Sequence, residues 1–354
     1  MENKKRMLKT IQAFGVEIGK SLVSICAAIL VGALVILAIG ENPIEAFTEL
    51  IRGAFGSRTY LANTISRAVP LIFTGLSVAV SSRCGMLNIG AEGQLYLGAM
   101  AVAIAGLYMG NVPSVIVIPL LLLIGFAGGM LGGLMAGILK AKFRISEVIA
   151  AIMLNYVFRF FTSFLATGRF SSGETSVQTI RLADNLSLTT LVSGTKLTTS
   201  ILFVILTALG IYIFLWRTTM GYKLRAVGYN GSAAMASGID ANKLMLFTMG
   251  LAGGLAGWAG SCEVLGNYHR FIEGFSPSYG FTGIAVAILG RNHPIGVVLT
   301  ALLFAVLDSG ALRMARVTAV SSSVVTVIQS LIIIAVAAPE MIRFIKKRKV
   351  VRAA

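Results

Sequence analysis

The sequence lacks the residue patterns with which most enzymes and nucleotide-binding proteins work. No G-x-S-x-G, H-E-x-x-H or Cys/His cluster occurs in it. The segment closest to a phosphate-binding loop, GVEIGKS at residues 15–21, is one residue short of G-x-x-x-x-G-K-[ST] and leads into an apolar run. We therefore expect neither catalysis nor a bound cofactor in this chain.

Cysteine and histidine are scarce as well. The three cysteines, Cys26, Cys84 and Cys262, are odd in number and lie in or beside apolar runs. Such a pattern implies neither a disulfide framework nor a metal site, so we expect small buried apolar residues. The two histidines, His269 and His293, fall at the ends of expected helices, where an interfacial position explains them.

Charged residues are also few, at 12% of the chain against about 25% in soluble domains. With 56% hydrophobic residues and a mean hydropathy of +0.86, this composition is typical of a polytopic membrane protein. The net charge of +16 would suggest a nucleic-acid partner in a soluble chain. Here Lys and Arg cluster in short segments between apolar runs, which indicates membrane orientation and no nucleic acid.

Long apolar runs predict the fold. A bilayer core of about 30 Å needs about 20 apolar residues in a helix. We therefore expect an all-α membrane domain over residues 21–340, flanked by tails at residues 1–20 and 341–354. Its ten expected helices lie at residues 21–40, 61–82, 87–108, 113–139, 146–167, 197–216, 243–263, 277–290, 295–312 and 320–338.

Positive charge gathers on one side of this arrangement. Ten spans put both termini on the same side, and the segments there hold 20 of the 30 Lys and Arg residues. That side, which includes residues 217–243, is expected to face the cytoplasm. Arg313 and Arg316 fall on the other side, so the last hairpin is the least regular part of this topology.

Three segments depart from the simple pattern. Residues 277–290 are too short to cross comfortably and contain Gly280 and Gly283, so a broken or re-entrant element is expected. Residues 41–55 have apolar positions at helical spacing and predict an amphipathic helix on the outer surface. Residues 168–196 are the longest polar stretch, an outer loop that either links two helices or contacts a delivery partner.

Small residues and an internal repeat predict how the helices pack. FTGLSVAV, starting at Phe73, resembles FTGIAVAI, starting at Phe281, and the same offset aligns Arg83 with Arg291. Two pseudo-repeated blocks of helices are typical of transporters. The glycine runs at residues 128–137 and 250–260 predict closely packed helix faces.

Polar residues interrupt the apolar run at GMLNIGAEGQ, residues 85–94. On a helix, Asn88, Glu92 and Tyr96 share one face at i, i+4 and i+8. An ionisable group inside a membrane is a functional hypothesis by default, so this face is a candidate lining of a substrate path. The alternative is structural: Asn88 caps the helix, and Glu92 pairs with an arginine such as Arg83.

A second polar group lies in EVIAAIMLNYVFRFF, residues 147–161. Asn155 and Arg159 share a helix face, and Tyr156 lies beside Asn155. An amide with aromatic neighbours suits a ring-bearing or polyhydroxyl solute. An interhelical hydrogen bond, worth about 1 kcal/mol, explains the amide equally well.

The segment MGYKLRAVGYNGSAAMASGIDANKL, residues 220–244, is rich in small residues. A short helix with a small-residue face can seat in a groove of another protein, because the backbones approach closely. Val227, Met235 and Ile239 are possible apolar anchors. The alternative is an ordinary connecting loop.

Four stretches together resemble a known family. PLIFTGLSVAVSSRCGMLNIGAEGQLYLGA, KAKFRISEVIAAIMLNY, LRAVGYNGSAAMASGI and YGFTGIAVAILGRNHPIG, within residues 70–296, resemble the permease subunits of bacterial ATP-binding-cassette (ABC) importers. The similarity is to the nucleoside and simple-sugar branch, which works with a lipoprotein-type solute-binding protein. It extends over nearly the whole chain from about residue 60.

This resemblance implies a multi-pass permease in a prokaryotic plasma (inner) membrane. It implies a cytoplasmic ABC ATPase that carries ATP and Mg²⁺, a solute-binding lipoprotein, and a second homologous permease in a heterodimer. The stretch 224–239 matches the family's coupling helix, which places ATPase contacts at Arg225, Gly228, Asn230, Ala233, Ala234, Gly238 and Ile239. The family's polar residues in the third and fifth spans correspond to Asn88, Glu92 and Asn155.

The expected function is therefore ATP-driven import of nucleosides or related simple sugars by alternating access. Glu92, Tyr96, Asn155 and Tyr156, with Asn88, are the candidate residues of the substrate path. The alternative is an ion-coupled secondary transporter that uses Glu92 or Asp308 and needs no partner. The residues alone do not separate nucleoside, free base and sugar.

Overall fold

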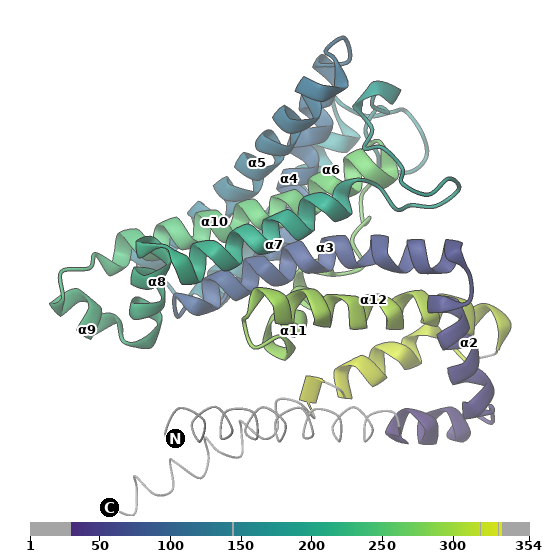
Figure 1. Ribbon diagram of the computed structural model, residues 1–354. Helices are drawn as coiled ribbons and strands as arrows, with labels where there is room; N and C mark the ends of the chain where they lie inside the picture. Colours follow the sequence, from purple (N-terminus) through teal and green to yellow (C-terminus); the bar gives the residue numbers. More distant parts are fainter. Residues whose placement is uncertain (1–29, 144, 319, 332, 335–354) are drawn as a thin grey trace, which may run out of the picture. The chain divides into compact units, whose positions relative to one another are not determined.

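The chain is helical in the part that the computed structural model describes, residues 30–143, 145–318, 320–331 and 333–334 (Figure 1). Only isolated β-bridges accompany the helices in this part. The principal helices are α2 (Pro43–Phe55), α3 (Arg58–Arg83), α4 (Ala91–Tyr108), α5 (Ser114–Phe143), α6 (Glu147–Thr167), α7 (Ser200–Arg217), α8 (Thr219–Tyr229), α9 (Gly231–Ala236), α10 (Ala241–Glu263), α11 (Tyr279–Leu289) and α12 (Pro294–Val317). The predicted all-α class is confirmed.

Within the described residues, six helices are long and apolar enough to span a membrane. A bent pair, Leu30–Ala38 and α2, makes up to seven if it counts as one span. These helices make the chain a multi-pass membrane protein. The expected number of ten and the placement of both termini stay predictions, since residues 1–29 and 335–354 lie outside the described part.

Residues 61–305 form one compact unit around two buried helices. α3 and α10 are largely buried, whereas α5, α6 and α7 expose most of their apolar side chains. The predicted glycine runs pack against each other, because a Cβ on Gly257 of α10 would lie 3.0 Å from the Gly129 Cα of α5. This packing is the small-residue contact expected between membrane helices.

α11 is half a span. Its 11 residues extend about 16 Å, roughly half of the hydrocarbon core. The helix packs on α3 where the predicted repeat copies lie: the Thr74 hydroxyl donates to the Tyr279 carbonyl at 3.0 Å. Arg83 donates to the Arg291 carbonyl at 3.0 Å, and these residues are equivalent in the repeat. The two copies therefore touch along α3 and α11.

The second compact unit combines the described residues up to Tyr60 with those from Val306 onward. α2 is confirmed as a helix, capped by the Asn42 side chain. Its buried Glu49 pairs with Arg313 of α12 at 2.7 Å. This pair explains why a positive charge falls on the side where the topology expects none, since the carboxylate compensates Arg313 locally.

The polar stretch before α7, residues 168–196, packs against the rest of the unit through buried leucines and main-chain hydrogen bonds. Leu182, Leu186 and Leu188 are buried in it, and the Leu188 amide donates to the Leu265 carbonyl at 2.9 Å. Leu265 belongs to a π-helical turn, Val264–Tyr268, that continues α10. α8 and α9 lie at the other end of α10 (Figure 1). With its π-turn, α10 spans 28 residues, or about 40 Å, so these two regions lie at opposite ends of a helix long enough to cross a bilayer.

Candidate functional site

The predicted docking segment forms two short helices. α8 ends at Tyr229 and α9 begins at Gly231, with Asn230 between them. The Asn230 side chain accepts from the Ala233 amide at 3.1 Å, an N-cap that starts the second helix. We call α8, α9 and the residues up to Ile239 the coupling segment.

α9 stops after six residues because Gly238 adopts a left-handed conformation, with φ +81°. The Ile239 amide donates to the Ala234 carbonyl and the Gly238 amide to the Met235 carbonyl, at 3.0 and 2.9 Å. These two bonds form the Schellman motif that ends many helices and turns the chain sharply. The predicted small-residue helix is thus a single short helix that ends in a tight turn, and we call α9 with its turn, residues 231–239, the knob.

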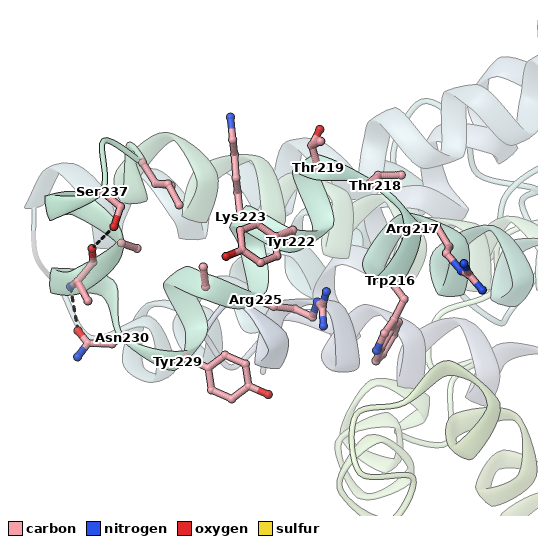
Figure 2. A pocket seen from close by; sticks show the side chains of 14 residues that line it. Trp216, Arg217, Thr218, Thr219, Tyr222, Lys223, Arg225, Tyr229, Asn230 and Ser237 are labelled. Carbon is pink, nitrogen blue, oxygen red and sulfur yellow. Dashed lines mark hydrogen bonds between the residues drawn. The ribbon is translucent and has the colours of Figure 1, made fainter. Parts of the chain in front are cut away.

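A hollow of about 840 Å³ lies beside this knob (Figure 2). We call it the docking hollow, and it is lined by Trp216, Arg217, Thr218, Thr219, Tyr222, Lys223, Arg225, Ala226, Tyr229, Asn230, Ala233, Ala234, Ser237 and Ile239. Two smaller hollows adjoin it. One, of about 300 Å³, includes Gly238, and the other, of about 150 Å³, includes Gly228. All seven residues predicted to contact an ATPase therefore line one connected surface.

The residues predicted to anchor a partner differ in solvent exposure. Met235 is 53% exposed on α9 and offers an apolar contact to a partner. Val227 is 4% exposed and packs inside the unit, so the prediction that it anchors a partner is wrong. Its position on α8 faces the same side as buried Leu224, which follows from helical spacing at i and i+3.

α8 is fixed tightly to the membrane helices. A Cβ on Gly228 would lie 2.9 Å from the carbonyl carbon of Arg83, the last residue of α3. A Cβ added to Gly85, whose φ is +78°, would lie 3.3 Å from the Gly228 Cα. Backbone therefore packs directly on backbone between α8 and the end of α3.

The electrostatics around the coupling segment are mostly positive. Asp240 caps α10 by accepting from the Lys243 amide at 3.1 Å, and hydrogen bonds to Lys243 hold the pKa of its carboxyl below its usual value. Burial, and then the charge of Arg83, lowers the pKa of His293. His293 packs against Trp216, with ring centroids 4.8 Å apart.

The polar residues predicted to share a helix face do not all lie on a helix. α4 begins at Ala91, so Asn88 precedes it, and the predicted stripe of Asn88, Glu92 and Tyr96 is wrong for Asn88. Small turn-forming residues around position 90 explain the later start. Asn88 is fully buried, and its amide exchanges two hydrogen bonds with the Gln94 amide, at 2.7 and 3.1 Å.

Glu92 holds α11 to α4. Its carboxylate accepts from the Gly280 amide at 2.6 Å, and Arg83 instead donates to main-chain carbonyls, so the alternative Glu92–Arg83 pair does not form. Tyr96, one turn later, is buried against Phe271 and Phe275, with ring centroids 6.0 and 5.1 Å apart.

Asn155 caps α4 from a neighbouring helix. Its side chain accepts from the Gly93 amide at 2.8 Å and donates to the Ile89 carbonyl at 3.0 Å. Gly93 lies in the first turn of α4, where main-chain donors have no partner within the helix. Tyr156 is 56% exposed and Arg159 is exposed, so neither joins the buried Asn155.

Three further residues matter that are not among the predicted site residues. Gln94 and Ser77 complete the Asn88 network, and the Ser77 hydroxyl donates to the Ala252 carbonyl of α10 at 2.6 Å. Trp216 supports two guanidinium groups near the coupling segment. Gln94 stands in the same polar stretch as Asn88, whereas Ser77 and Trp216 carry no distinguishing sequence signal.

Comparisons with known proteins identify the family of this chain. A family described as "Branched-chain amino acid transport system / permease component" matches residues 60–337. The chain is 34% identical to the nucleoside ABC transporter permease protein NupB of Lactococcus lactis, over 94% of each protein. It is 35% identical to the guanosine ABC transporter permease protein NupP of Bacillus subtilis, over 92% of this chain and 94% of that one.

A third relative is the glucose ABC transporter permease protein TsgB13 of Haloferax volcanii. Identity is 32%, over 89% of this chain and 86% of that protein. All three relatives are transport subunits rather than enzymes, which confirms both the expected non-enzymatic role and the resemblance to ABC permeases. The chain belongs to the family of permease components of branched-chain amino acid transport systems.

Proposed function

We propose that this chain is the permease subunit of an ATP-driven importer that moves nucleosides, or related simple sugars, across a prokaryotic plasma membrane. The observation that carries the proposal is the coupling segment. It forms a closed knob beside a large hollow, and backbone contact joins it to α3. ATP and Mg²⁺ belong to a partner ATPase that docks on this surface.

Force from the ATPase has a direct route into the membrane domain. α8 packs on the last residue of α3, and α3 is one of the two largely buried helices. A rocking motion of helix blocks then alternates access to a central path. Both termini and the basic tails lie on the ATPase side, by the distribution of Lys and Arg.

For the substrate path we favour the contact between α4 and α11. Glu92 and Tyr96 lie there, with the aromatic rings of Phe271 and Phe275 beside them. Aromatic faces and a few polar groups suit an uncharged nucleoside. Asn88 and Asn155 act as supports of this region through their hydrogen bonds. Tyr156 faces outward and lies nearest to lipid or a second permease.

The relatives support the substrate class, and the family resemblance suggests the assembly. Two relatives are named for nucleosides or guanosine and one for glucose, at similar identity, so identity does not choose between the two substrate classes. The aromatic ring cluster around Tyr96 favours a nucleoside over a sugar. An extracytoplasmic lipoprotein delivers the solute. A second homologous permease completes a heterodimer.

The test is uptake into proteoliposomes that contain both permeases, the ATPase and the binding protein encoded with them. Uptake of labelled guanosine, adenosine, cytidine, ribose and glucose is compared with and without internal ATP. The expected result is ATP-dependent nucleoside uptake. Uptake that needs only an ion gradient, and persists without the ATPase, would support the ion-coupled alternative with Glu92 or Asp308.

A variant in the coupling segment completes the test. Met235→Asp places a charge on the exposed apolar anchor and is expected to abolish ATPase binding and uptake. Met235→Leu keeps an apolar side chain of similar size and should retain both. Wild-type ATPase binding by Met235→Asp would refute docking at the knob.

A further inference from the structure

The smallest hollow beside the coupling segment is built from arginines. It has a volume of about 150 Å³ and contains Arg83, Arg225 and Arg291, together with Ser82, Tyr229 and Asn292. None of the described residues that line it is acidic. We call this hollow the arginine pocket.

Two of its guanidinium groups are held in place without an anion. The Arg83 and Arg225 groups lie 5.3 and 5.6 Å from the centre of the same Trp216 ring. Contact with the ring face stabilises a cation but does not cancel its charge. Among the described residues neither arginine has an acidic partner, and the buried Nε of Arg225 has no hydrogen-bond acceptor.

The third arginine is presented by a strained turn. Arg291 and Asn292 both have positive φ, 55° and 52°, although neither is glycine. Left-handed backbone costs a residue such as Arg291 about 1–2 kcal/mol, whereas asparagine adopts it more readily. Arg83 braces the turn by donating to both carbonyls, at 3.0 and 2.9 Å. The turn therefore keeps Arg291 at the pocket against a local energetic cost.

We propose that the arginine pocket receives the carboxylate of an acidic side chain from the ATPase that docks on the coupling segment. This inference rests on the proposed function. Guanidinium donors match a carboxylate in geometry and charge, and an unpaired buried donor such as the Arg225 Nε gains an acceptor. The incoming charge also relieves the repulsion between the Arg83 and Arg225 guanidinium groups, which contact the same Trp216 ring.

Position favours a protein carboxylate over a lipid phosphate. Arg225 and Tyr229 line both the arginine pocket and the docking hollow, so one partner can occupy the two together. A lipid headgroup brings acyl chains that need apolar surface beside it. In the described part of the chain no aliphatic side chain lines the arginine pocket, and Tyr229, which lines it, is 83% exposed.

The experiment measures the affinity of the purified ATPase for the permease heterodimer in nanodiscs, at low and high NaCl. Arg225→Gln and Arg291→Gln are each expected to weaken binding about tenfold or more and to reduce its dependence on salt, because a charged contact is lost. Lys142→Gln, on α5, removes one positive charge outside the pocket and should change neither. Arg225→Lys keeps the charge and should retain part of the affinity.

A cross-link identifies the occupant. A photoreactive amino acid at position 229, in place of Tyr229, is expected to label an ATPase peptide that contains Asp or Glu. Reversing that acid to Arg should restore binding to Arg225→Glu permease. Such a rescue depends on charge and is not produced by a merely structural role of Arg225.

The outcomes are distinct. Wild-type affinity and salt dependence in both Gln variants would overturn the inference, while loss of binding in Met235→Asp would leave the proposed function standing. Wild-type binding by Met235→Asp as well would refute both. If the variants change only the retention of phosphatidylglycerol, added to phosphatidylcholine nanodiscs, the occupant is a lipid phosphate and the inference is overturned.

Discussion

The carboxylate of Glu92 accepts a hydrogen bond from the main-chain amide of Gly280, at 2.6 Å, although the two residues are 188 positions apart. The bond joins the first turn of α4 to the first turn of α11, two helix starts whose main-chain donors need acceptors from elsewhere. Glu92 is thus engaged with backbone rather than with a basic side chain. Its role in transport is therefore testable by separating hydrogen bonding from charge.

Glu92→Gln retains an oxygen acceptor for Gly280, whereas Glu92→Ala leaves that amide without one. We expect Glu92→Gln to keep ATP-driven uptake and Glu92→Ala to lose most of it, with a lower melting temperature in detergent. An unpaired donor of this kind costs about 1–3 kcal/mol. If well-folded Glu92→Gln failed to transport, the ionisable group itself would be required, in agreement with an ion-coupled mechanism.

Asn155→Leu should destabilise the contact between α6 and α4. The change removes the acceptor of the Gly93 amide and the donor to the Ile89 carbonyl, and loss of such a helix cap costs about 0.5–2 kcal/mol. Thermal unfolding in one detergent measures the difference. The neighbouring Tyr156→Phe is the control, since its exposed hydroxyl has no role in this contact; equal effects of both variants would contradict the assignment.

Two glycines of the coupling segment separate backbone conformation from contact. No atom lies within 4 Å of a Cβ added to Gly238 or to Gly231, but only Gly238 has a positive φ. We expect Gly238→Ala to destabilise the end of α9 by about 1–2 kcal/mol and to reduce ATP-driven uptake. Larger replacements such as Gly238→Arg should abolish uptake and still insert into the membrane.

Gly231→Ala should leave uptake unchanged in the same assay, because its conformation suits any residue. Equal behaviour of the two alanine variants would show that the left-handed turn is not needed for coupling.

The pKa of His293 should report on Arg83. Burial lowers this pKa first and the Arg83 charge adds to it, so Arg83→Gln is expected to raise the pKa partway toward its ordinary value. Burial and then the charge of Arg181 lower the pKa of His269, which serves as an internal control. NMR of histidine-labelled protein follows both imidazoles, and an unchanged His293 in Arg83→Gln would contradict the coupling.

A consequence for stability follows from the same shift. Folded His293 binds its proton less readily than the unfolded chain does, so its contribution to stability is present above about pH 6.5, the ordinary histidine value. That contribution is lost as the pH falls from there to the lowered pKa. The loss should be smaller in Arg83→Gln, as melting temperatures across this range would show.

The sequence was most informative where a single physical requirement dominates. Apolar length predicts α5, α6 and α7 to within a few residues, and small residues predict the contact around Gly129 and Gly257. The knob of α9 is signalled by Asn230 as an N-cap and Gly238 as the terminating glycine, both recognisable from local chemistry. These features depend on neighbours in sequence or on solvent.

The candidate site was harder because its contacts join distant segments. Asn88 was expected on a helix, yet its partners Ser77 and Gln94 hold it in the turn before α4. Asn155 fits the same local pattern whether it lines a path or caps another helix. Val227 has the character of an anchor, and only the burial of α8 on its inner side shows that it is unavailable to a partner.

The bond from Arg83 to the carbonyl of Arg291 links equivalent ends of the two repeat copies, and Arg83 is also the residue of α3 on which Gly228 packs. If an ATPase acts on α8 as we propose, its force reaches both copies at this one contact, instead of reaching the second copy through the first. The importer then needs no separate connection from the ATPase to each half of this subunit. On this proposal the two copies move together, because the Arg83 side chain is bonded to the main chain of the second copy's end.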